Sequence, residues 1–387
     1  MADVPHSAAI TSAIPTPLST SKATAETQLV RAHMPELDSV RGVAVLMVVF
    51  YHAFYWGMNL PLFPPIERQL LQLTWVGRLG VNLFFVLSGF LITGLLLNAK
   101  SRPDYYRKFY IRRALRILPA YFATLLVLLV TGVSLKFIGL SLLYLSNLTP
   151  LFGVAIAYPV LWSLAVEEHF YLLWPLAVRK FSSRALLAGA AAMILVSPLL
   201  RWVSYEVQSR QGWVSYETFD YTWNSADGLA CGAFLALWLR EFAPDRKKFA
   251  KEIVALLVIG LALLPFGTLS RHTATGAALQ VTPWHFLFVV VIGAALLAGS
   301  RWGEAARCRL LEFFGEISYG LYLYHLLVFR GFEWLLNNGV IRRPQIDPLL
   351  GLSIRLLICG GIAVGIAWLS RRYIEEPFLR LKSRLAP

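Results

Sequence analysis

The chain has 387 residues, of which 57% are hydrophobic and 15% charged, and its mean hydropathy is +0.59. A soluble domain carries more charge, so this composition excludes an ordinary soluble protein and indicates a polytopic helical membrane protein. The net charge of +14 does not indicate nucleic-acid binding, because the Lys and Arg residues fall in loops between apolar stretches. Cys231, Cys308 and Cys359 lack metal-ligand spacing, so we expect no zinc or other metal site and no disulfide.

The apolar stretches predict an all-α polytopic fold of about ten transmembrane helices. They are 37–57, 78–98, 117–134, 158–178, 185–203, 224–240, 252–268, 283–299, 317–336 and 351–371. We expect one transmembrane domain over 36–376 and a basic cytoplasmic tail over 377–387. Residues 1–35 are rich in Ala, Ser, Thr and Pro and lack the features of a secretory signal, which indicates a flexible cytoplasmic tail.

The basic loops predict the orientation of these helices. The loop after the second stretch, around 100–116, is strongly basic, and so are the later even-numbered loops and the C-terminal end. The positive-inside rule places all of them in the cytoplasm, together with both termini. The apolar run 137–148 is therefore expected not to span, because a crossing there would move every later basic loop outward.

The first stretch places Arg41 and His52 eleven residues apart inside an apolar span. In a helix that spacing brings the two side chains to within about 20° of one face, roughly 16 Å apart along the axis. Asp38 lies three residues before Arg41. Ionisable groups inside a membrane usually face the protein interior and mark a site or a pathway. The alternative is that Arg41 and His52 are anchors that reach the two interfaces.

Two further polar features follow along the chain. Ser88-Gly89 forms a small patch in the second stretch, where a ligand or a neighbouring helix can approach closely. Arg112, Arg113 and Arg116 cluster where the chain re-enters the membrane. Guanidinium groups suit phosphates, although a topology signal that meets anionic lipid has the same pattern.

The fourth stretch contains Glu167, Glu168 and His169 among large apolar residues. Glu167 shares a helix face with Ser163 and Tyr171, four residues away on either side. With this span running inward, Glu167 is about 13 Å below the outer end of its helix and His52 about 8 Å below the same boundary. A histidine–carboxylate contact would form if the helices are neighbours, whereas structural pairing of buried charges is the alternative.

The ninth stretch places Ser318, Tyr322 and His325 on one stripe, with His325 expected in the cytoplasmic half. A lone buried histidine is more often structural than catalytic, so His325 ranks below His52 as a candidate catalyst.

Together, these blocks resemble the acyltransferase-3 family of membrane acyltransferases, which acylate sugars and other hydroxylated acceptors. The resemblance covers about 36–376 and rests on the Arg41–His52 spacing, the Phe-Phe-Val-Leu-Ser-Gly-Phe run 84–90, the cluster Arg112-Arg113-x-x-Arg116 and the motif Trp162-Ser-Leu-x-x-Glu167. The family's Asp-Gly-x-Arg-Gly occurs here with Ser39 in place of its first Gly, a small departure.

The resemblance implies a ten-span core in the cytoplasmic (inner) membrane. Acyl-CoA, commonly acetyl-CoA, would enter from the cytoplasm and a glycan or glycolipid acceptor, such as a surface polysaccharide or lipopolysaccharide, would bind on the outer side. Some relatives carry an additional extracytoplasmic esterase-like domain. We find none before Pro387, so we expect the membrane core to transfer the acyl group itself or to pass it to a partner.

In this reaction we expect His52 to act as the base or as a transient acyl carrier, with Glu167 orienting it. Arg41 would hold the pantetheine or phosphate end of the donor, and the three-arginine cluster would hold its nucleotide phosphates. The other predicted donor-site residues are Ser88 and His325. The predicted acceptor-site residues are Asp38, Trp162, Ser163 and Tyr171.

Two alternatives fit the same pattern of polar residues. A transporter or flippase of a glycolipid or anionic solute would also place them in a helical bundle, and an acyltransferase could act on a small molecule such as a macrolide. The acceptor stays open, because outward aromatic residues can stack on sugars or belong to a membrane-surface belt. These residues are Trp56, Trp75, Trp213, Tyr216 and Trp223. The oligomeric state is open as well.

Overall fold

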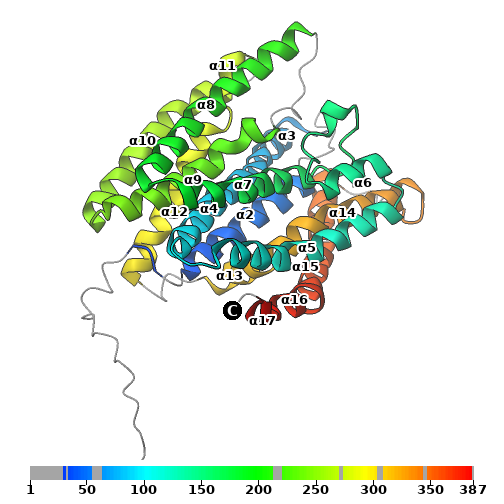
Figure 1. Cartoon of the computed structure of the whole chain (residues 1–387). Coiled ribbons are helices and arrows are strands. Elements are labelled where there is room, and N and C mark those ends of the chain that lie inside the picture. Colours follow the sequence, from blue (N-terminus) through cyan, green and yellow to red (C-terminus); the bar gives the residue numbers. More distant parts are fainter. Residues whose placement is uncertain are drawn as a thin grey trace, which may run out of the picture.

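The structure, a computed structural model, describes residues 29–31, 34–54, 63–211, 220–269, 273–302, 308–342 and 347–385. Within these ranges the regular elements are all helices, which confirms the predicted all-α class (Figure 1). The long helices are α2 (Pro35–Phe54), α4 (Gly80–Ala99), α5 (Tyr105–Val130), α7 (Leu161–Lys180), α8 (Ser183–Arg210), α9 (Thr222–Phe242), α10 (Arg246–Leu269), α12 (Thr282–Trp302), α14 (Ser318–Asn337) and α15 (Pro348–Ser370).

Short helices connect or extend the long ones. They are α3 (Pro65–Leu73), η2 (Thr74–Leu79), α6 (Leu135–Leu142), η3 (Thr149–Phe152), α11 (Ala274–Leu279), α13 (Arg309–Glu316), η6 (Arg371–Glu375), α16 (Glu376–Arg380) and α17 (Lys382–Leu385). The ambiguous run 137–148 contributes only to α6, whose eight residues span about 12 Å and cannot cross a bilayer.

Seven helical segments of the described chain are long and apolar enough to cross a membrane. They are Pro35–Phe54, Pro65–Ala99, Tyr105–Val130, Ser183–Arg210, Arg246–Thr268, Ala274–Gly299 and Pro348–Arg380. The remaining long helices, α7, α9 and α14, coincide with predicted stretches but carry polar side chains toward the interior, among them Glu167, Asp227 and His325.

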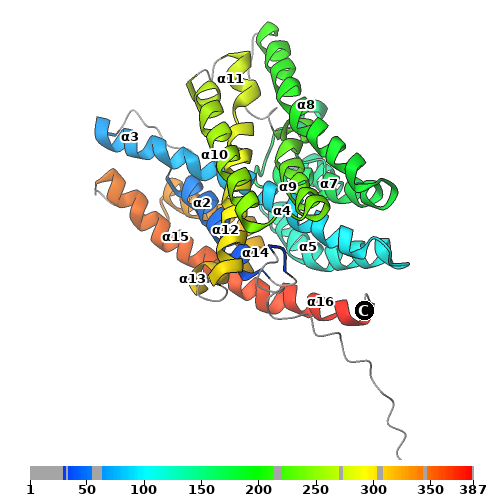
Figure 2. The same cartoon turned by 90° about the vertical axis from the view of Figure 1, so that its left-hand side faces the viewer.

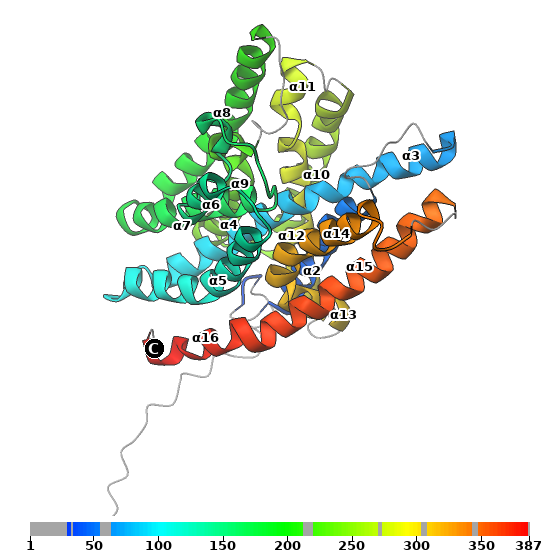
Figure 3. The same cartoon turned by 90° about the vertical axis from the view of Figure 1, so that its right-hand side faces the viewer.

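Helix α4 occupies the centre of the bundle and packs against α9, α2, α7 and α12. Figures 2 and 3 show α8, α10 and α11 on one side of this core, and α15 with α16 crossing the opposite side. The helices α4 and α9 meet at two glycines. A Cβ atom at Gly89 would overlap the carbonyl group of Leu229, and one at Gly232 would overlap that of Val86. The close approach predicted at Ser88-Gly89 is therefore a helix–helix contact at Gly89.

The ends of the predicted domain are packed onto the bundle. Leu29 is buried in the core, and Arg31 donates to Gly299 O at 3.1 Å and pairs with Glu36. The rest of the predicted N-terminal tail, residues 1–28 and 32–33, lies outside the described residues. At the other end, the predicted basic tail is helical through Leu385, because α15 continues through a π-helical turn, η6, into α16 and α17.

Candidate functional site

A cavity of about 930 Å³ lies between α4, α5, α7 and α14. Most of the predicted donor-site residues line it, together with two predicted for other roles. These predicted residues are Arg41, Ser88, Arg112, Arg113, Arg116, Ser163 and Glu167. The cavity therefore brings together residues from seven separate helices, α2, α4, α5, α7, α9, α14 and α17; α14 contributes Ser318, Tyr319 and Tyr322.

The cavity is polarised along α4. Its lining on that helix extends from Ala99 to Val81, roughly 27 Å along the axis. At the Ala99 end it is strongly basic; we call this the basic end, formed by Arg102, Lys108, Arg112 and Lys382. At the other end the lining includes Phe84, Phe85, Ser163 and Tyr322, which we call the closed end. A charged molecule would be attracted to the first end and its apolar part accommodated toward the second.

Glu167 is held in place by groups from three helices. Its Oε1 accepts from Ser88 Oγ of α4 at 3.0 Å, and its Oε2 accepts from Tyr171 OH, one turn along α7, at 2.8 Å. Arg113 of α5 approaches the same Oε2 at 3.6 Å. A buried carboxylate requires such partners, because an unpaired charge in an apolar interior is costly. The arrangement fixes the Glu167 carboxylate on the cavity wall.

The three arginines of α5 have different environments. Arg113 stacks on the Tyr171 ring at 3.4 Å and lies 3.8 Å from Glu168 Oε1 in addition to its Glu167 contact. Arg116 lines the cavity and is exposed there, without a hydrogen bond or ion pair to any described residue. Arg113 is therefore occupied by internal partners, whereas Arg116 can bind an anion.

Lys382 adds a basic group that sequence analysis assigned only to a tail. It reaches the cavity from α17. Partial burial lowers the pKa of its ammonium group, and the positive charges of Arg116, Arg112 and Arg371 lower it further. An anion bound among these groups would relieve their mutual repulsion, so the basic end is suited to a multiply charged ligand such as a set of phosphates.

His52 forms a pair with His325 next to the cavity. His325 Nδ1 lies 2.9 Å from Leu321 O and His325 Nε2 lies 3.1 Å from His52 Nδ1, which also lies 2.9 Å from Val48 O. In neutral rings, His325 then donates from Nδ1 and accepts at Nε2, so His52 carries its proton on Nδ1. His52 Nε2 is consequently the basic nitrogen of the pair.

This pairing differs from two predictions. His325 was expected in the cytoplasmic half and His52 near the outer boundary, but the two rings lie 4.9 Å apart. Helices cross at angles, so residue counts along each helix gave the wrong relative depth. Glu167 was expected to orient His52, but within the described chain its contacts are with Ser88, Tyr171 and Arg113.

The histidine pair adjoins the cavity through Tyr322. The His325 and Tyr322 rings lie 6.1 Å apart, and Tyr322 OH is 2.5 Å from Ser163 Oγ at the closed end. His52 itself is not part of the cavity lining that the structure describes. The Tyr322 ring therefore lies between the closed end of the cavity and the two imidazoles.

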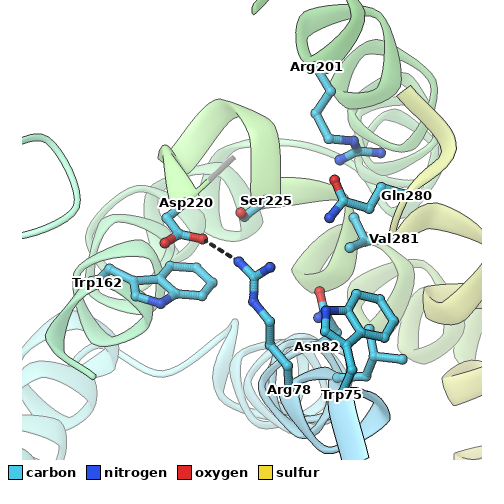
Figure 4. A pocket seen from close by; sticks show the side chains of 10 residues that line it. Trp75, Arg78, Asn82, Trp162, Arg201, Asp220, Ser225, Gln280 and Val281 are labelled. Carbon is cyan, nitrogen blue, oxygen red and sulfur yellow. Dashed lines mark hydrogen bonds and ion pairs between the residues drawn. The ribbon is translucent and has the colours of Figure 1, made fainter. Parts of the chain in front are cut away.

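The remaining predicted acceptor-site residues lie in different places. Asp38 pairs with Arg41 at 2.6 Å, and Tyr171 lies beneath Arg113. Trp162 lines a second, much smaller pocket, of about 30 Å³, at the opposite end of α4 from the basic end. Figure 4 shows this pocket, with Trp162 beside the Arg78–Asp220 ion pair. Trp56, Trp213 and Tyr216 lie outside the described residues.

Sequence analysis missed a second buried charged centre. Arg201 of α8 bonds both carboxylate oxygens of Asp227 of α9, at 3.1 and 3.0 Å, and His285 Nδ1 of α12 lies 3.2 Å from Asp227 Oδ2. Each of these three residues falls inside a predicted apolar stretch, and this unusual position was the feature of the sequence that could have indicated a buried charged centre. Their pairing depends on three helices meeting, and no spacing along the chain shows it. Among the described residues no group of His, Cys, Asp and Glu side chains is arranged to hold a metal ion.

Comparison with known proteins identifies the relatives of this chain. The family model for the acyltransferase domain of acyltransferase-3 proteins matches residues 34–372. The peptidoglycan O-acetyltransferase OatA of Listeria monocytogenes is 27% identical over 91% of this chain and 56% of its own length. The putative peptidoglycan O-acetyltransferase YrhL of Bacillus subtilis is 29% identical over 76% of this chain and 48% of its own length.

The O-acetyltransferase OatA of Staphylococcus aureus is also similar, with 26% identity over 89% of this chain and 57% of its own length. The chain thus spans about half the length of these curated relatives. No solved structure is detectably similar to it.

A double-mutant cycle tests the partnership of Arg113 and Glu167. Arg113→Ala or Glu167→Ala alone removes one charge and leaves its partner in a poorly solvated site, so each should lower the stability of the purified protein. The double variant removes both charges and should be more stable than the sum of the single losses predicts, by roughly 0.5–3 kcal/mol. Thermal unfolding in detergent measures all four proteins; strict additivity would show that the two charges do not interact.

Proposed function

This chain belongs to the acyltransferase-3 family, and we propose that it is a multi-pass membrane O-acyltransferase that moves an acetyl group from cytoplasmic acetyl-CoA to a hydroxyl group of a glycan or glycolipid at the outer side of the cytoplasmic membrane. The observation that carries this proposal is the polarised cavity. It is basic at one end, and its closed end adjoins the His52–His325 pair. Its volume of about 930 Å³ falls in the range of small-molecule sites.

The proposed topology has ten spans with both termini in the cytoplasm. The ten long helices supply the spans, and the polar side chains of α7, α9 and α14 face one another inside the bundle, where a membrane protein tolerates them. The basic end of the cavity then faces the cytoplasm, in keeping with the positive-inside rule.

The donor would enter from this basic end. Arg116, Arg112 and Lys382 bind its nucleotide phosphates, and the pantetheine arm extends past Arg41 and Ser88 toward the closed end. We assign Arg113 a different role from the one its sequence cluster indicates. Its contacts with Glu167 and Tyr171 make it a group that shapes the wall of the cavity. Acetyl-CoA is the donor substrate, and the proposed reaction needs no metal.

The chemical step uses His52 as a general base. Its Nε2 removes the proton of the acceptor hydroxyl as that oxygen attacks the thioester carbonyl; the carbon–sulfur bond then breaks, and the imidazolium returns the proton to the leaving thiolate. His325 accepts the Nδ1 proton of His52 in a hydrogen bond and so fixes the required tautomer. The Ser163 and Tyr322 hydroxyls bond each other at the closed end, and the one whose proton is not used in that bond would donate to the oxyanion.

His52→Ala tests the proposed base. In proteoliposomes supplied with acetyl-CoA and an acceptor glycan, this variant should release CoA thiol about 10²- to 10⁴-fold more slowly than wild type. His169→Ala is the control, because His169 bonds Thr222 at 2.6 Å and does not line the cavity. Wild-type activity in His52→Ala would remove this residue from the mechanism. A wild-type protein that moves solute without consuming acetyl-CoA would instead identify a transporter.

Arg116→Ala and Lys382→Ala test the donor site. Each removes a charge-assisted contact to phosphate, worth roughly 1.5–3 kcal/mol, so the KM for acetyl-CoA should rise about tenfold or more with little change in kcat. Arg184→Ala is the matched control, because that side chain is 88% exposed and pairs with Glu241 away from the cavity. An unchanged donor KM in both cavity variants would return the basic end to a role in topology.

A further inference from the structure

The small pocket at the opposite end of α4 has a lining unlike that of the donor cavity. It lies where η2, α4, α7 and α9 begin and where α11 meets α12. Two tryptophans and several planar polar side chains surround it (Figure 4). These residues are Trp75, Arg78, Asn82, Trp162, Asp220 and Gln280. Such a lining combines flat apolar faces with groups that donate and accept hydrogen bonds in fixed directions.

The wall behind the pocket is rigid. Arg201 uses all its N–H groups on internal partners: Nε donates to Ala278 O at 3.0 Å, and the two Nη atoms donate to Asp227 and to neighbouring oxygens. Those neighbours are Asn224 O and Thr282 Oγ1. These acceptors belong to α9, to α12 and, through Ala278, to α11, so the guanidinium joins three helices at the pocket wall. Arg201 is thus a structural clamp.

Asn82 and Arg78 are the groups that face a ligand. His285 Nε2 lies 2.8 Å from Asn82 Oδ1, and His285 is in turn held by Asp227, so the amide has a fixed orientation. Arg78 contacts Asp220 Oδ1 at 3.3 Å, its one hydrogen-bonding partner among the described residues. A guanidinium has five N–H groups, so Arg78 retains donors for a ligand.

We propose that this pocket binds a sugar unit of the acceptor glycan, an inference that rests on the proposed function. A pyranose ring has apolar C–H faces, which stack on an indole, and equatorial hydroxyls, which pair with planar side chains such as those of Arg78, Asp220 and Asn82. Trp162 provides the stacking face, and Trp75 and Gln280 complete the lining. In the structure the pocket has room for about two waters. The sugar therefore enters by parting the Arg78–Asp220 pair, whose hydrogen bonds its hydroxyls replace.

The position of the pocket suits an acceptor. Its Trp162 side chain packs edge-on against Phe85 at 5.7 Å, and Phe85 lines the closed end of the donor cavity. The helix η2, which carries Arg78, packs directly on α2, with Gly77 against Tyr51, the residue before His52. A sugar in this pocket would hold the glycan beside α2, the helix that carries the proposed base. Because the Phe85–Trp162 pair separates this sugar from the donor, the attacking hydroxyl belongs to another unit of the same glycan.

The test measures binding and transfer separately on the whole protein in detergent. The probes are soluble oligomers of N-acetylglucosamine and, in parallel, of glucose. Binding without donor is measured by saturation-transfer NMR. Initial rates are measured with the acceptor varied at saturating acetyl-CoA, and with acetyl-CoA varied at a fixed acceptor concentration. Trp162→Ala and Arg78→Ala should each weaken binding and raise the acceptor KM about tenfold, the loss of a stacking or polar contact, while the donor KM stays unchanged.

Two further variants make the result decisive. Trp162→Phe keeps an aromatic face and should retain most of the affinity. Trp334→Ala removes a tryptophan that is 60% exposed on α14 and absent from the pocket lining, and it should change nothing. Unchanged binding in Trp162→Ala and Arg78→Ala, or equal losses in Trp162→Phe and Trp162→Ala, would overturn the inference. So would a wild-type protein that binds neither oligomer, whereas binding without transfer would overturn the proposed function alone.

Discussion

The contact between the Glu167 carboxylate and its partners on α4 and α5 is the constraint on which the site depends. A carboxylate in an apolar bundle is tolerated only when it is paired and hydrogen-bonded. Ser88 and Arg113 satisfy this need from two other helices, and Tyr171 does so from the same helix. The three helices therefore cannot close on one another as an apolar bundle would. The space they leave between them is the cavity with the basic end.

The same physics operates on the other side of α4. Asp227 is buried and paired with Arg201 and His285, and His285 reaches Asn82 of α4. Asn82 and Ser88 are six residues apart, which places them about 120° apart around the helix. Ser88 of α4 thus bonds the carboxylate in the wall of the large cavity, and Asn82 bonds the charged centre behind the small pocket. Helix α4, with Phe85 between these positions, is the wall between the two spaces.

Much of the site could be predicted from residue types in unexpected places. Arg41, Ser88, Arg116 and Glu167 were singled out because they interrupt apolar stretches, and all four line one cavity. The fold class and the short non-spanning run 137–148 followed from hydropathy and from loop charge. Helical periodicity gives the face on which a residue lies, and that was sufficient for these features.

The partners of these residues could not be predicted in the same way. Periodicity does not say how helices cross, so His52 was paired with Glu167 when its ring lies against His325. The adjacent Arg113 and Arg116 were treated as one cluster, although a single turn of helix separates an internally paired guanidinium from one exposed to the cavity. Arg201, Asp227 and His285 lie on three helices, and Lys382 reaches the cavity only because α16 and α17 pack against α5. Tertiary packing decides each of these contacts.

The central claim is that the large cavity receives CoA from the cytoplasm, and side-specific labelling of Gly94→Cys tests it most directly. Gly94 lies on α4, lines the cavity and has open space where a side chain would extend. Cys231 and Cys359 are buried, so Cys308→Ser supplies a suitable background. The account predicts that a charged, membrane-impermeant thiol reagent labels Gly94→Cys only from the cytoplasmic side and that CoA protects it. Labelling from the outer side, or labelling that CoA leaves unchanged, would contradict the account.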